Sequence, residues 1–397
     1  MRKISADYIY PISTPPIQNG IILIEDGVII DVLGMKEGKK KTKDAYSEVP
    51  IEYYKGIICP GFINTHCHLE LSNLRGKIIN STGLAGFIDD LIAKRIDSSP
   101  IEINQAIVDA EKEMLSNGIV AVGDISNGEL TFIQKELGNL RYHTFIEVHS
   151  LNPEKSEESF NKGLLLSNKI KHQCSIIPHA PYTVSDKLME KINLYLTHKK
   201  SILSIHNQES QAENDFFINK TGPLVDLYKK RGLDISFFKS TGNNSLKSTL
   251  VQLSKLNKIL LVHNTYTSKE DIRWAQKYSK KICWCFCPKA NLYIENRLPD
   301  FQSFLDENAR VTIGTDSLAS NSTLSILEEL KTITQHAPQI SMETLFTWAT
   351  KNGAIFFDFD KEMGTIEKGK KPGLNWIKNI DLKAMRLTPE SSIEKLI

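Results

Sequence analysis

Short apolar runs alternate with amphipathic stretches along most of the chain. Apolar runs of about four to eight residues between turn signals predict buried strands, and apolar residues recurring every three or four positions predict helices. Strands are expected at residues 56–59, 118–124, 144–149, 174–179, 202–206, 259–263, 282–287 and 311–316. Helices are expected at residues 101–117, 186–198, 269–278, 324–335 and 341–357.

The alternation of strands and helices predicts the fold. A strand followed by a helix, repeated eight times, is the pattern of a (β/α)8 TIM-type barrel. A doubly wound open sheet is the alternative, but no Gly-x-Gly-x-x-Gly follows the first strand. We therefore expect an α/β fold whose catalytic barrel spans residues 60–362.

The two chain ends have a different pattern from the middle. Residues 1–59 contain short strand-like runs, among them a hairpin in which Glu25-Asp26-Gly27 joins residues 20–24 to 28–32. Residues 363–397 return to a Gly- and Lys-containing turn and a short apolar run. We expect both ends to form one small β module beside the barrel.

Composition narrows the functional classes. The 397 residues include 49 Lys and Arg against 47 Asp and Glu, so the net charge of +2 does not favour nucleic acid or an anionic membrane as a partner. Neither a signal peptide nor a membrane span is predicted. The six cysteines lack Cys-x-x-Cys spacing and suit reduced thiols. We expect a cytoplasmic protein with a small-molecule substrate, and a homodimer as the default assembly.

Polar side chains stand at the carboxyl ends of the predicted strands, which in a barrel meet at one mouth where catalytic groups gather. These residues are His66, His68, Asp124, His149, His179, His206, His263 and Asp316. Each one alone could be an ordinary hydrogen-bonded group of a loop. Their shared position in one chain argues for a functional site instead.

The residue types in this set predict a metal centre. His66 and His68 are two residues apart, so on an extended backbone both imidazoles leave the same face. His206 and Asp316 could complete a set of three imidazoles and one carboxylate around one divalent ion. Glu209, three residues after His206, could shuttle protons next to that ion without binding it.

Several stretches together resemble the amidohydrolase superfamily, in its aminohydrolase branch of nucleoside, guanine and triazine deaminases and chlorohydrolases. The matching stretches are Pro60-Gly61-Phe62-Ile63-Asn64-Thr65-His66-Cys67-His68, His206 with Glu209, His263, Cys287-Pro288 with Asn291-Leu292, Gly314-Thr315-Asp316-Ser317 with Ser320-Asn321, Ala349-Thr350 with Asn352-Gly353-Ala354, and Gly364-Thr365-Ile366-Glu367-Lys368-Gly369-Lys370. The resemblance covers nearly the whole chain. One departure is Pro372-Gly373-Leu374, where the family often has Ala-Asp-Leu.

The resemblance implies a role for each residue. His66, His68, His206 and Asp316 would bind one divalent metal, Glu209 would be the acid/base, and His263 would hold the nucleophilic water or the developing oxyanion. Both chain ends would form a β-sandwich. The fourth strand carries no lysine, unlike binuclear relatives, which favours one metal ion. Arg75, His179 and Tyr182 would contact substrate, while Glu70 and His149 receive no assigned role.

The predicted reaction is hydrolytic removal of an amino group from an N-heterocycle, with Asp316 accepting a proton from water and Glu209 protonating the ring nitrogen. Adenosine-like nucleosides, aminodeoxyfutalosine, pterins and guanine-like bases remain open as substrates, and Zn2+ or Fe2+ as the metal. A cyclic amide or chloro-substituted ring could be hydrolysed at the same site. A non-catalytic scaffold is disfavoured because all four expected ligand positions are intact.

Overall fold

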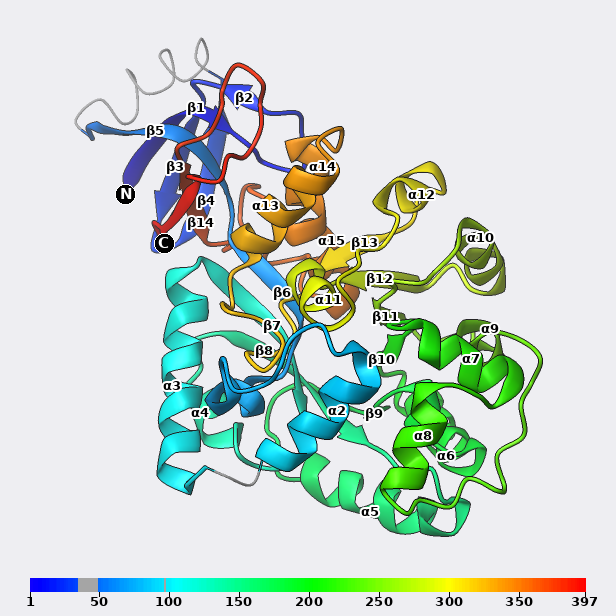
Figure 1. The fold of residues 1–397 in the computed structure, drawn as a ribbon. Helices are drawn as coiled ribbons and strands as arrows, with labels where there is room; N and C mark the ends of the chain where they lie inside the picture. Colours follow the sequence, from blue (N-terminus) through cyan, green and yellow to red (C-terminus); the bar gives the residue numbers. More distant parts are fainter. Residues whose placement is uncertain (35–48, 96–97) are drawn as a thin grey trace. The chain divides into compact units, whose positions relative to one another are not determined.

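The computed structural model describes residues 1–34, 49–95 and 98–397 (Figure 1). The chain forms two compact units. One comprises residues 1–64, 112–121 and 325–397, and the other comprises residues 65–111 and 122–324. The predicted division at residues 59 and 362 remains a prediction.

A seven-stranded sheet is the main feature of the first unit. Its strands are β1 (Arg2–Ile9), β2 (Ile17–Gln18), β3 (Ile21–Glu25), β4 (Val28–Leu33), β5 (Ile51–Pro60), β14 (Leu374–Lys378) and β15 (Ser392–Lys395). They run in the order β15-β14-β5-β1-β3-β4, with β2 beside β1. Strand β14 pairs antiparallel with β5, so both ends of the chain contribute to one sheet (Figure 1).

The expected hairpin is the pair β3–β4. Asp26 and Gly27, the two residues between the strands, have φ angles of 49° and 78°. Positive φ at both central residues is the geometry of a type I′ turn, whose twist suits antiparallel strands. Apolar side chains of this sheet form a common core that includes Ile4, Ile22 and Leu374.

The helices of the first unit's C-terminal part are α13 (Ile326–His336), α14 (Met342–Ala349) and α15 (Lys351–Phe357). The single helix predicted at 341–357 is therefore two helices. The break falls at Thr350, whose ψ is −82° and whose hydroxyl donates to the Phe346 carbonyl. A threonine hydroxyl that bonds the backbone in this way competes with the helical pattern.

Eight further strands form two four-stranded sheets. The first has the order β6 (Phe62–Cys67), β7 (Ile119–Ser126), β8 (Arg141–Val148) and β9 (Cys174–Pro178). The second has the order β10 (Leu203–Asn207), β11 (Ile259–His263), β12 (Ile282–Phe286) and β13 (Val311–Ile313). Neighbouring strands of the second sheet are all parallel, as are β8 and β9.

Hydrogen bonds join the edges of these two sheets at the carboxyl ends of their strands. The His206 amide donates to the His179 carbonyl at 3.1 Å, which links β10 to the end of β9. At the other edge, the Thr315 and Asp316 amides both donate to the His66 carbonyl at 3.1 Å. The strand ends that carry the predicted site are thereby brought together.

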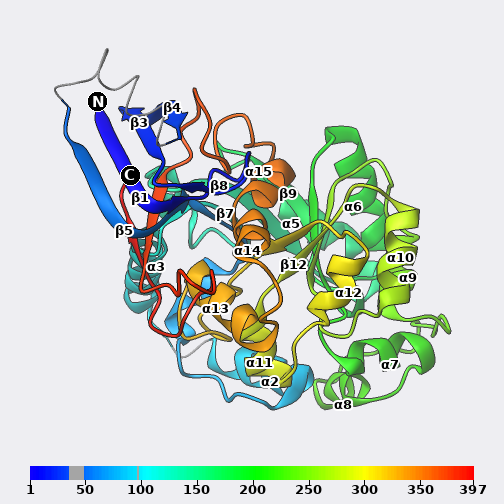
Figure 2. The same cartoon turned by 90° about the horizontal axis from the view of Figure 1, so that it is seen from above.

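Helices connect these strands. They are α2 (Gly83–Lys94), α3 (Pro100–Ser116), α4 (Phe132–Glu136), α5 (Ser156–Ser167), α6 (Asp186–Lys199), α7 (Gln211–Asn219), α8 (Pro223–Lys230), α9 (Ser245–Leu250), α10 (Lys269–Tyr278), α11 (Pro288–Glu295) and α12 (Phe301–Asp306), with short 3-10 turns η1 (Leu69–Leu74), η2 (Pro153–Lys155) and η3 (Pro181–Thr183). Helices α5 and α6 pack against β8 and β9. Figure 2 shows α6 and α10 on the outer side of the strands.

Two strand predictions need correction. The apolar run at residues 56–59 is the end of β5 in the seven-stranded sheet, and the strand that carries His66 is β6. The strand predicted at 311–316 stops at Ile313, because the next residues turn to donate their amides to His66.

None of the helices in the described residues is both long enough and apolar enough to span a membrane.

Candidate functional site

The site is assembled from the ends of four strands. His66 lies in β6, His206 in β10 and His263 at the end of β11, while Asp316 follows β13. All four are buried. Gly314 allows the chain after β13 to lie close to β6, since a Cβ atom at 314 would lie 2.8 Å from the His66 Cβ and 2.9 Å from the Cys285 Sγ. A residue with any side chain at 314 would push β13 away from β6.

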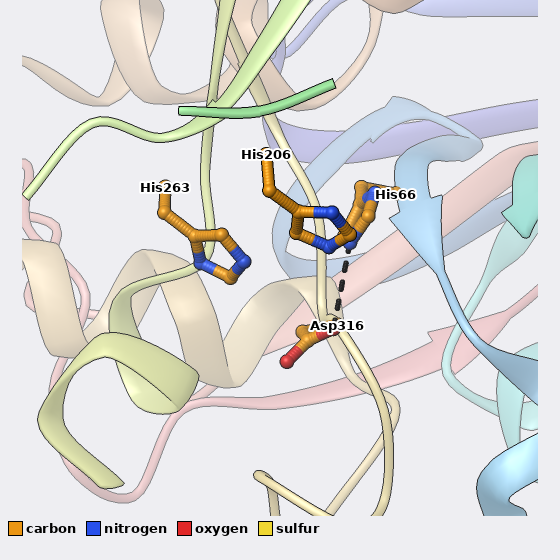
Figure 3. A group of neighbouring side chains, drawn as sticks. All are labelled: His66, His206, His263 and Asp316. Atoms are coloured by element: carbon orange, nitrogen blue, oxygen red, sulfur yellow. Dashed lines mark ion pairs between the residues drawn. The ribbon is translucent and has the colours of Figure 1, made fainter. Parts of the chain in front are cut away.

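Asp316 is the common partner of His66 and His68. Its Oδ1 lies 3.4 Å from His66 Nε2 and 3.5 Å from His68 Nε2. One ligand atom each from His66, His206, His263 and Asp316 lies within 4.8 Å of the others (Figure 3). This set contains His263 and not His68, although His68 Nε2 also lies close to Asp316.

For His206 and His263, hydrogen bonds determine which ring nitrogen carries the proton and which keeps its lone pair. His206 Nδ1 lies 2.8 Å from the His179 carbonyl oxygen, which can only accept, so Nδ1 donates and Nε2 keeps its lone pair. His263 Nδ1 likewise lies 2.9 Å from Asn291 Oδ1. The Asn291 amide nitrogen donates to the His263 carbonyl at 3.3 Å, which fixes the orientation of that amide. Outer partners of this kind orient metal-binding histidines.

The charge state of the cluster suits a cation. Burial lowers the pKa of His68 and of His263 to about 4 each. Burial and the neighbouring imidazoles hold the pKa of His206 well below its usual value. Burial raises the pKa of Asp316, but the histidines around it outweigh this and hold that pKa well below its usual value. Burial lowers the pKa of His66, but the hydrogen bond to Asp316 and the charge of that carboxylate outweigh burial and raise this pKa. The other three imidazoles are neutral beside an ionised carboxylate, and these are the forms that bind metals.

His66 provides a direct test of whether the residues fit a metal ion. Among the described residues its buried Nδ1 has no hydrogen-bond partner, and its Nε2 has only the ion pair with Asp316. A buried polar atom without a hydrogen bond is costly, and a cation beside Asp316 would satisfy Nε2, the nitrogen that faces this carboxylate. The donor set of imidazole nitrogens and carboxylate oxygen therefore fits a divalent ion such as zinc.

Glu209 stands beside the cluster rather than within it. Its Oε1 lies 3.6 Å from His263 Nε2, and only 4% of the residue is exposed. Burial, with the nearby carboxylates of Asp316 and Glu213, raises the pKa of Glu209 well above its usual value. A carboxyl group that keeps its proton near neutral pH can act as a general acid.

The backbone is left-handed at two of the site residues. His263 has a φ of 75° and Asp316 a φ of 56°. Asn264, with a φ of 59°, holds the turn at His263 by donating from its side-chain Nδ2 to the Leu261 carbonyl at 2.8 Å. Such conformations cost about 1–3 kcal/mol each and concentrate at functional sites.

The three predicted substrate contacts lie in different surroundings. His179 follows β9, and its ring centroid is 4.8 Å from that of His206. Tyr182 is 2% exposed and belongs to an apolar cluster with Leu74, Phe216 and others. Arg75 is exposed at the end of η1. Their contact with substrate remains a prediction.

Sequence reasoning missed Glu147. This buried carboxylate in β8 lies 3.9 Å from His206 Nδ1, and its Oε1 accepts a hydrogen bond from the Asn127 side-chain Nδ2 at 2.7 Å. The strand ending at residue 149 drew attention to His149, which is exposed, whereas Glu147 points the same way two residues earlier. Glu147 and His149 also line a cavity of about 650 Å3 next to α5.

Glu70 and Asp124 support the loop that follows β6. Glu70 is buried and accepts from Arg95 Nη2 at 2.6 Å and from the Asn127 amide at 3.0 Å. Asp124 accepts from the Leu69 amide at 2.8 Å and pairs with the buried Lys135 at 2.5 Å. Both carboxylates therefore position the backbone beside His68.

The sequence of this chain is similar to those of known enzymes. The family described as the amidohydrolase family matches residues 57–395. An adenosine deaminase of Helicobacter pylori is 25% identical over 364 residues, covering 89% of this chain and 87% of the relative. A 5'-deoxyadenosine deaminase of Methanobrevibacter smithii is 25% identical over 410 residues, covering 94% of this chain and 86% of the relative.

Solved structures are similar over almost the full length. Helicobacter pylori aminofutalosine deaminase in complex with methylthio-coformycin has a TM-score of 0.79 at 20% identity, covering 98% of this chain and 94% of its own. Atrazine chlorohydrolase of Arthrobacter aurescens complexed with zinc has a TM-score of 0.70 at 16% identity, and the match covers 94% of this chain and 86% of the chlorohydrolase chain. Both comparisons indicate a TIM-barrel-type α/β fold.

Proposed function

The chain belongs to the amidohydrolase family, and we propose that it is a metal-dependent hydrolase that removes the amino group from an amino-substituted N-heterocycle and releases ammonia. The observation that carries this proposal is the position of Glu209. A buried carboxyl group whose pKa is strongly raised lies 3.6 Å from His263 and beside a His/Asp cluster that fits a cation. Deamination needs a proton donor in that position, because an aromatic ring nitrogen must be protonated as water attacks the adjacent carbon.

We assign His66, His68, His206 and Asp316 as the ligands of one divalent ion, with zinc as the first choice. His66 and His68 both direct Nε2 at the same Asp316 oxygen, and the free nitrogen of His206 is its Nε2. An ion held there would supply the Lewis acidity that lowers the pKa of water toward neutrality. The presence of zinc in the chlorohydrolase complex supports this choice of metal.

His263 is assigned to the nucleophile rather than to the ion. Its Nδ1–H is engaged by Asn291, so the lone pair on Nε2 can accept a hydrogen bond from the attacking water. The same nitrogen lies within reach of Glu209. Metal content of two variants tests the assignment: His68→Ala should lose the metal, and His263→Ala should keep it. The reverse result would exchange the two roles.

The chain's own residues then account for the proton transfers. Asp316, held ionised by its histidine neighbours, accepts a proton from the water as the oxygen bonds to the amino-bearing carbon. Glu209 gives its proton to the adjacent ring nitrogen. The proton held by Asp316 passes to the amino group, the carbon–nitrogen bond breaks, and ammonia leaves. The hydroxyl proton of the intermediate returns to Glu209, so the ring becomes an oxo compound and the acid is restored.

The substrate class we propose is a purine-type nucleoside or a related base. The deaminase relatives act on adenosine and 5'-deoxyadenosine by their names, and the structural relative on aminofutalosine. Pterins and guanine-like bases remain candidates. His179 and Tyr182 are the proposed ring contacts, and Arg75 a proposed contact at the rim.

A second candidate reaction is hydrolysis of a chloro-substituted ring or a cyclic amide. The similarity to atrazine chlorohydrolase favours it, because the same arrangement of water and acid could displace halide. Products distinguish the two: ammonia for deamination, and chloride or a ring-opened acid for the alternative.

We further propose that the eight strands β6–β13 close into one barrel and that the chain ends form a β-sandwich. The hydrogen bonds from His206 to His179 and from Asp316 to His66 support closure. The predictions of a homodimer and of a cytoplasmic enzyme stay predictions.

The decisive experiment is a screen of amino-substituted heterocycles for ammonia release by the zinc-loaded protein. We expect turnover of at least one nucleoside, with the oxo product identified by mass spectrometry. Release of chloride from chlorinated rings without any ammonia release from amino-substituted ones would overturn the proposal.

A further inference from the structure

Glu213 is a buried acid that the proposed chemistry does not use. It lies in the first turn of α7, four residues after Glu209, and none of its surface is exposed. Burying a carboxylate without partners is expensive, so its contacts indicate what it does.

Both oxygens of Glu213 hold the turn that carries Glu209. Its Oε1 accepts a hydrogen bond from the Gln208 amide at 2.9 Å, and its Oε2 accepts one from the Glu209 amide at 3.1 Å. Gln208 has a φ of 43°, a left-handed conformation that a non-glycine residue adopts only when its surroundings enforce it. The Glu213 carboxylate therefore accepts hydrogen bonds from two successive backbone amides at a strained turn.

The same turn is held from its other side by the loop after β11. The Tyr266 amide donates to the Gln208 carbonyl at 2.9 Å, and the Thr267 hydroxyl donates to Gln208 Oε1 at 2.8 Å. Glu213 in α7 thus holds this turn from one side, and Tyr266 and Thr267, which follow His263 in the chain, hold it from the other. We call these three residues the clamp. The clamp fixes the backbone from which the Glu209 side chain extends toward His263.

We propose that Glu213 is a positioning residue that fixes the backbone of Glu209 so that the acid points at the reacting ring. This inference rests on the proposed function, in which Glu209 is the proton donor. Because both Glu213 oxygens are taken by backbone amides inside the protein, Glu213 acts through Glu209 and does not touch substrate.

The simpler explanation is that Glu213 only caps α7. Ser210-Gln211-Ala212-Glu213 has the spacing of a capping box, in which the glutamate would bond the amide of Ser210. The bonds observed go to the two residues before Ser210 instead. A cap alone would affect stability and leave the catalytic step unchanged.

The first measurement is steady-state kinetics of Glu213→Gln in the metal-loaded enzyme. An amide has one oxygen to accept from two N–H groups, so one of them loses its partner. We expect kcat to fall about 10–100-fold, the range typical of outer residues that orient a functional group, with KM and metal content little changed. Glu213→Asp, which keeps both oxygens, should recover part of the loss.

Glu111→Gln is the matched control. Glu111 is also buried, and it accepts from Tyr142 at 2.8 Å and from Asn139 at 3.0 Å, away from the turn. This variant should lose stability comparably while its kcat stays near that of the wild type.

The second measurement is a double-mutant cycle with Glu209→Gln. If Glu213 acts through the acid, Glu213→Gln should have no further effect on the residual rate of Glu209→Gln. Amide hydrogen exchange supplies a readout without substrate: Gln208 and Glu209 should exchange faster in Glu213→Gln, and other strand ends should not.

Each outcome decides the inference. Normal kcat in Glu213→Gln, unchanged exchange at Gln208 and Glu209, loss of metal, or an equal loss of rate in both backgrounds would each overturn it. Full activity in Glu209→Gln would instead overturn the proposed function. Full loss in Glu209→Gln with no loss in Glu213→Gln would leave the function standing and remove only the role of Glu213.

Discussion

Substitutions of Glu209 and His66 should separate proton transfer from metal binding. Glu209→Gln should keep the metal, because this carboxyl group is proposed to stand outside the ligand set, but an amide cannot relay a proton. General acid–base steps contribute about 10²–10⁴-fold, and we expect a loss of kcat at the upper end. His66→Ala should lose metal and activity together. Metal content and ammonia release are measured on the same preparations, and near-normal turnover by Glu209→Gln would contradict the mechanism.

His143 should make the protein sensitive to acid. This buried side chain, 2.8 Å from the Ser175 hydroxyl, has a pKa lowered by burial to about 3. Between about pH 3 and 6.5 the unfolded chain binds a proton at this residue that the folded chain does not, so stability falls as pH falls. At pH 5 the loss from this residue is about 2 kcal/mol relative to pH 7.

Urea unfolding at pH 7 and pH 5 measures this effect. His143→Gln should show the smaller drop, since its side chain cannot gain the proton on unfolding. His336→Gln, at an exposed position, should keep the full drop of the wild type. An identical drop in all three proteins would show that His143 does not contribute.

On the scale of helices and strands, the pair Asp124–Lys135 ties α4 to β7. Both side chains are fully buried, and Lys135 also donates to Ser126 at 2.9 Å and to Thr144 at 3.1 Å. Lys135→Met should leave the Asp124 charge buried without its cation and cost about 3–5 kcal/mol of unfolding free energy. Denaturant unfolding checks this.

The exposed pair Lys169–Glu129 is the control for that measurement. Its N–O distance is also 2.5 Å, but both side chains are about half exposed. Lys169→Met should cost no more than about 1 kcal/mol. Equal costs for the two lysines would mean that burial does not set the strength of the Asp124–Lys135 pair.

Periodicity predicted which segments are strands and helices, and it failed where side chains or strand partners decide. Residues 269–278 and 259–263 match α10 and β11 to the residue. The helix expected at 341–357 breaks at Thr350 through a side-chain hydrogen bond that periodicity does not encode. The run at 56–59 has the pattern of a barrel strand, and only its pairing with β1 and β14 assigns it to another sheet.

The candidate site was predictable to the extent that residue types identify ligands. His66, His206 and Asp316 were found because imidazole and carboxylate at strand ends are recognisable. Glu147 and Glu213 were not, because a glutamate in a strand or in a first helical turn is ordinary in sequence. Their burial and their partners exist only in the folded chain.

For the whole molecule, metal removal should lower thermal stability. An ion that binds only the folded chain adds about 4 kcal/mol when its free concentration is roughly 1,000 times its dissociation constant. A strong chelator should therefore lower the melting temperature of the wild type, and added zinc should restore it. His66→Ala should melt at the same temperature with and without chelator. A wild-type melting temperature that changes with neither the chelator nor added zinc would argue against a metal centre.

The pairing of β5 with β14 has a consequence for synthesis on the ribosome. Strand β5 emerges early, but the strand that covers its edge is among the last segments to be translated. Until then β5 presents unpaired amide and carbonyl groups, which are a template for association with other chains. A nascent chain of this protein therefore carries an open sheet edge through most of its translation, and chaperones that bind extended segments have that whole interval in which to act.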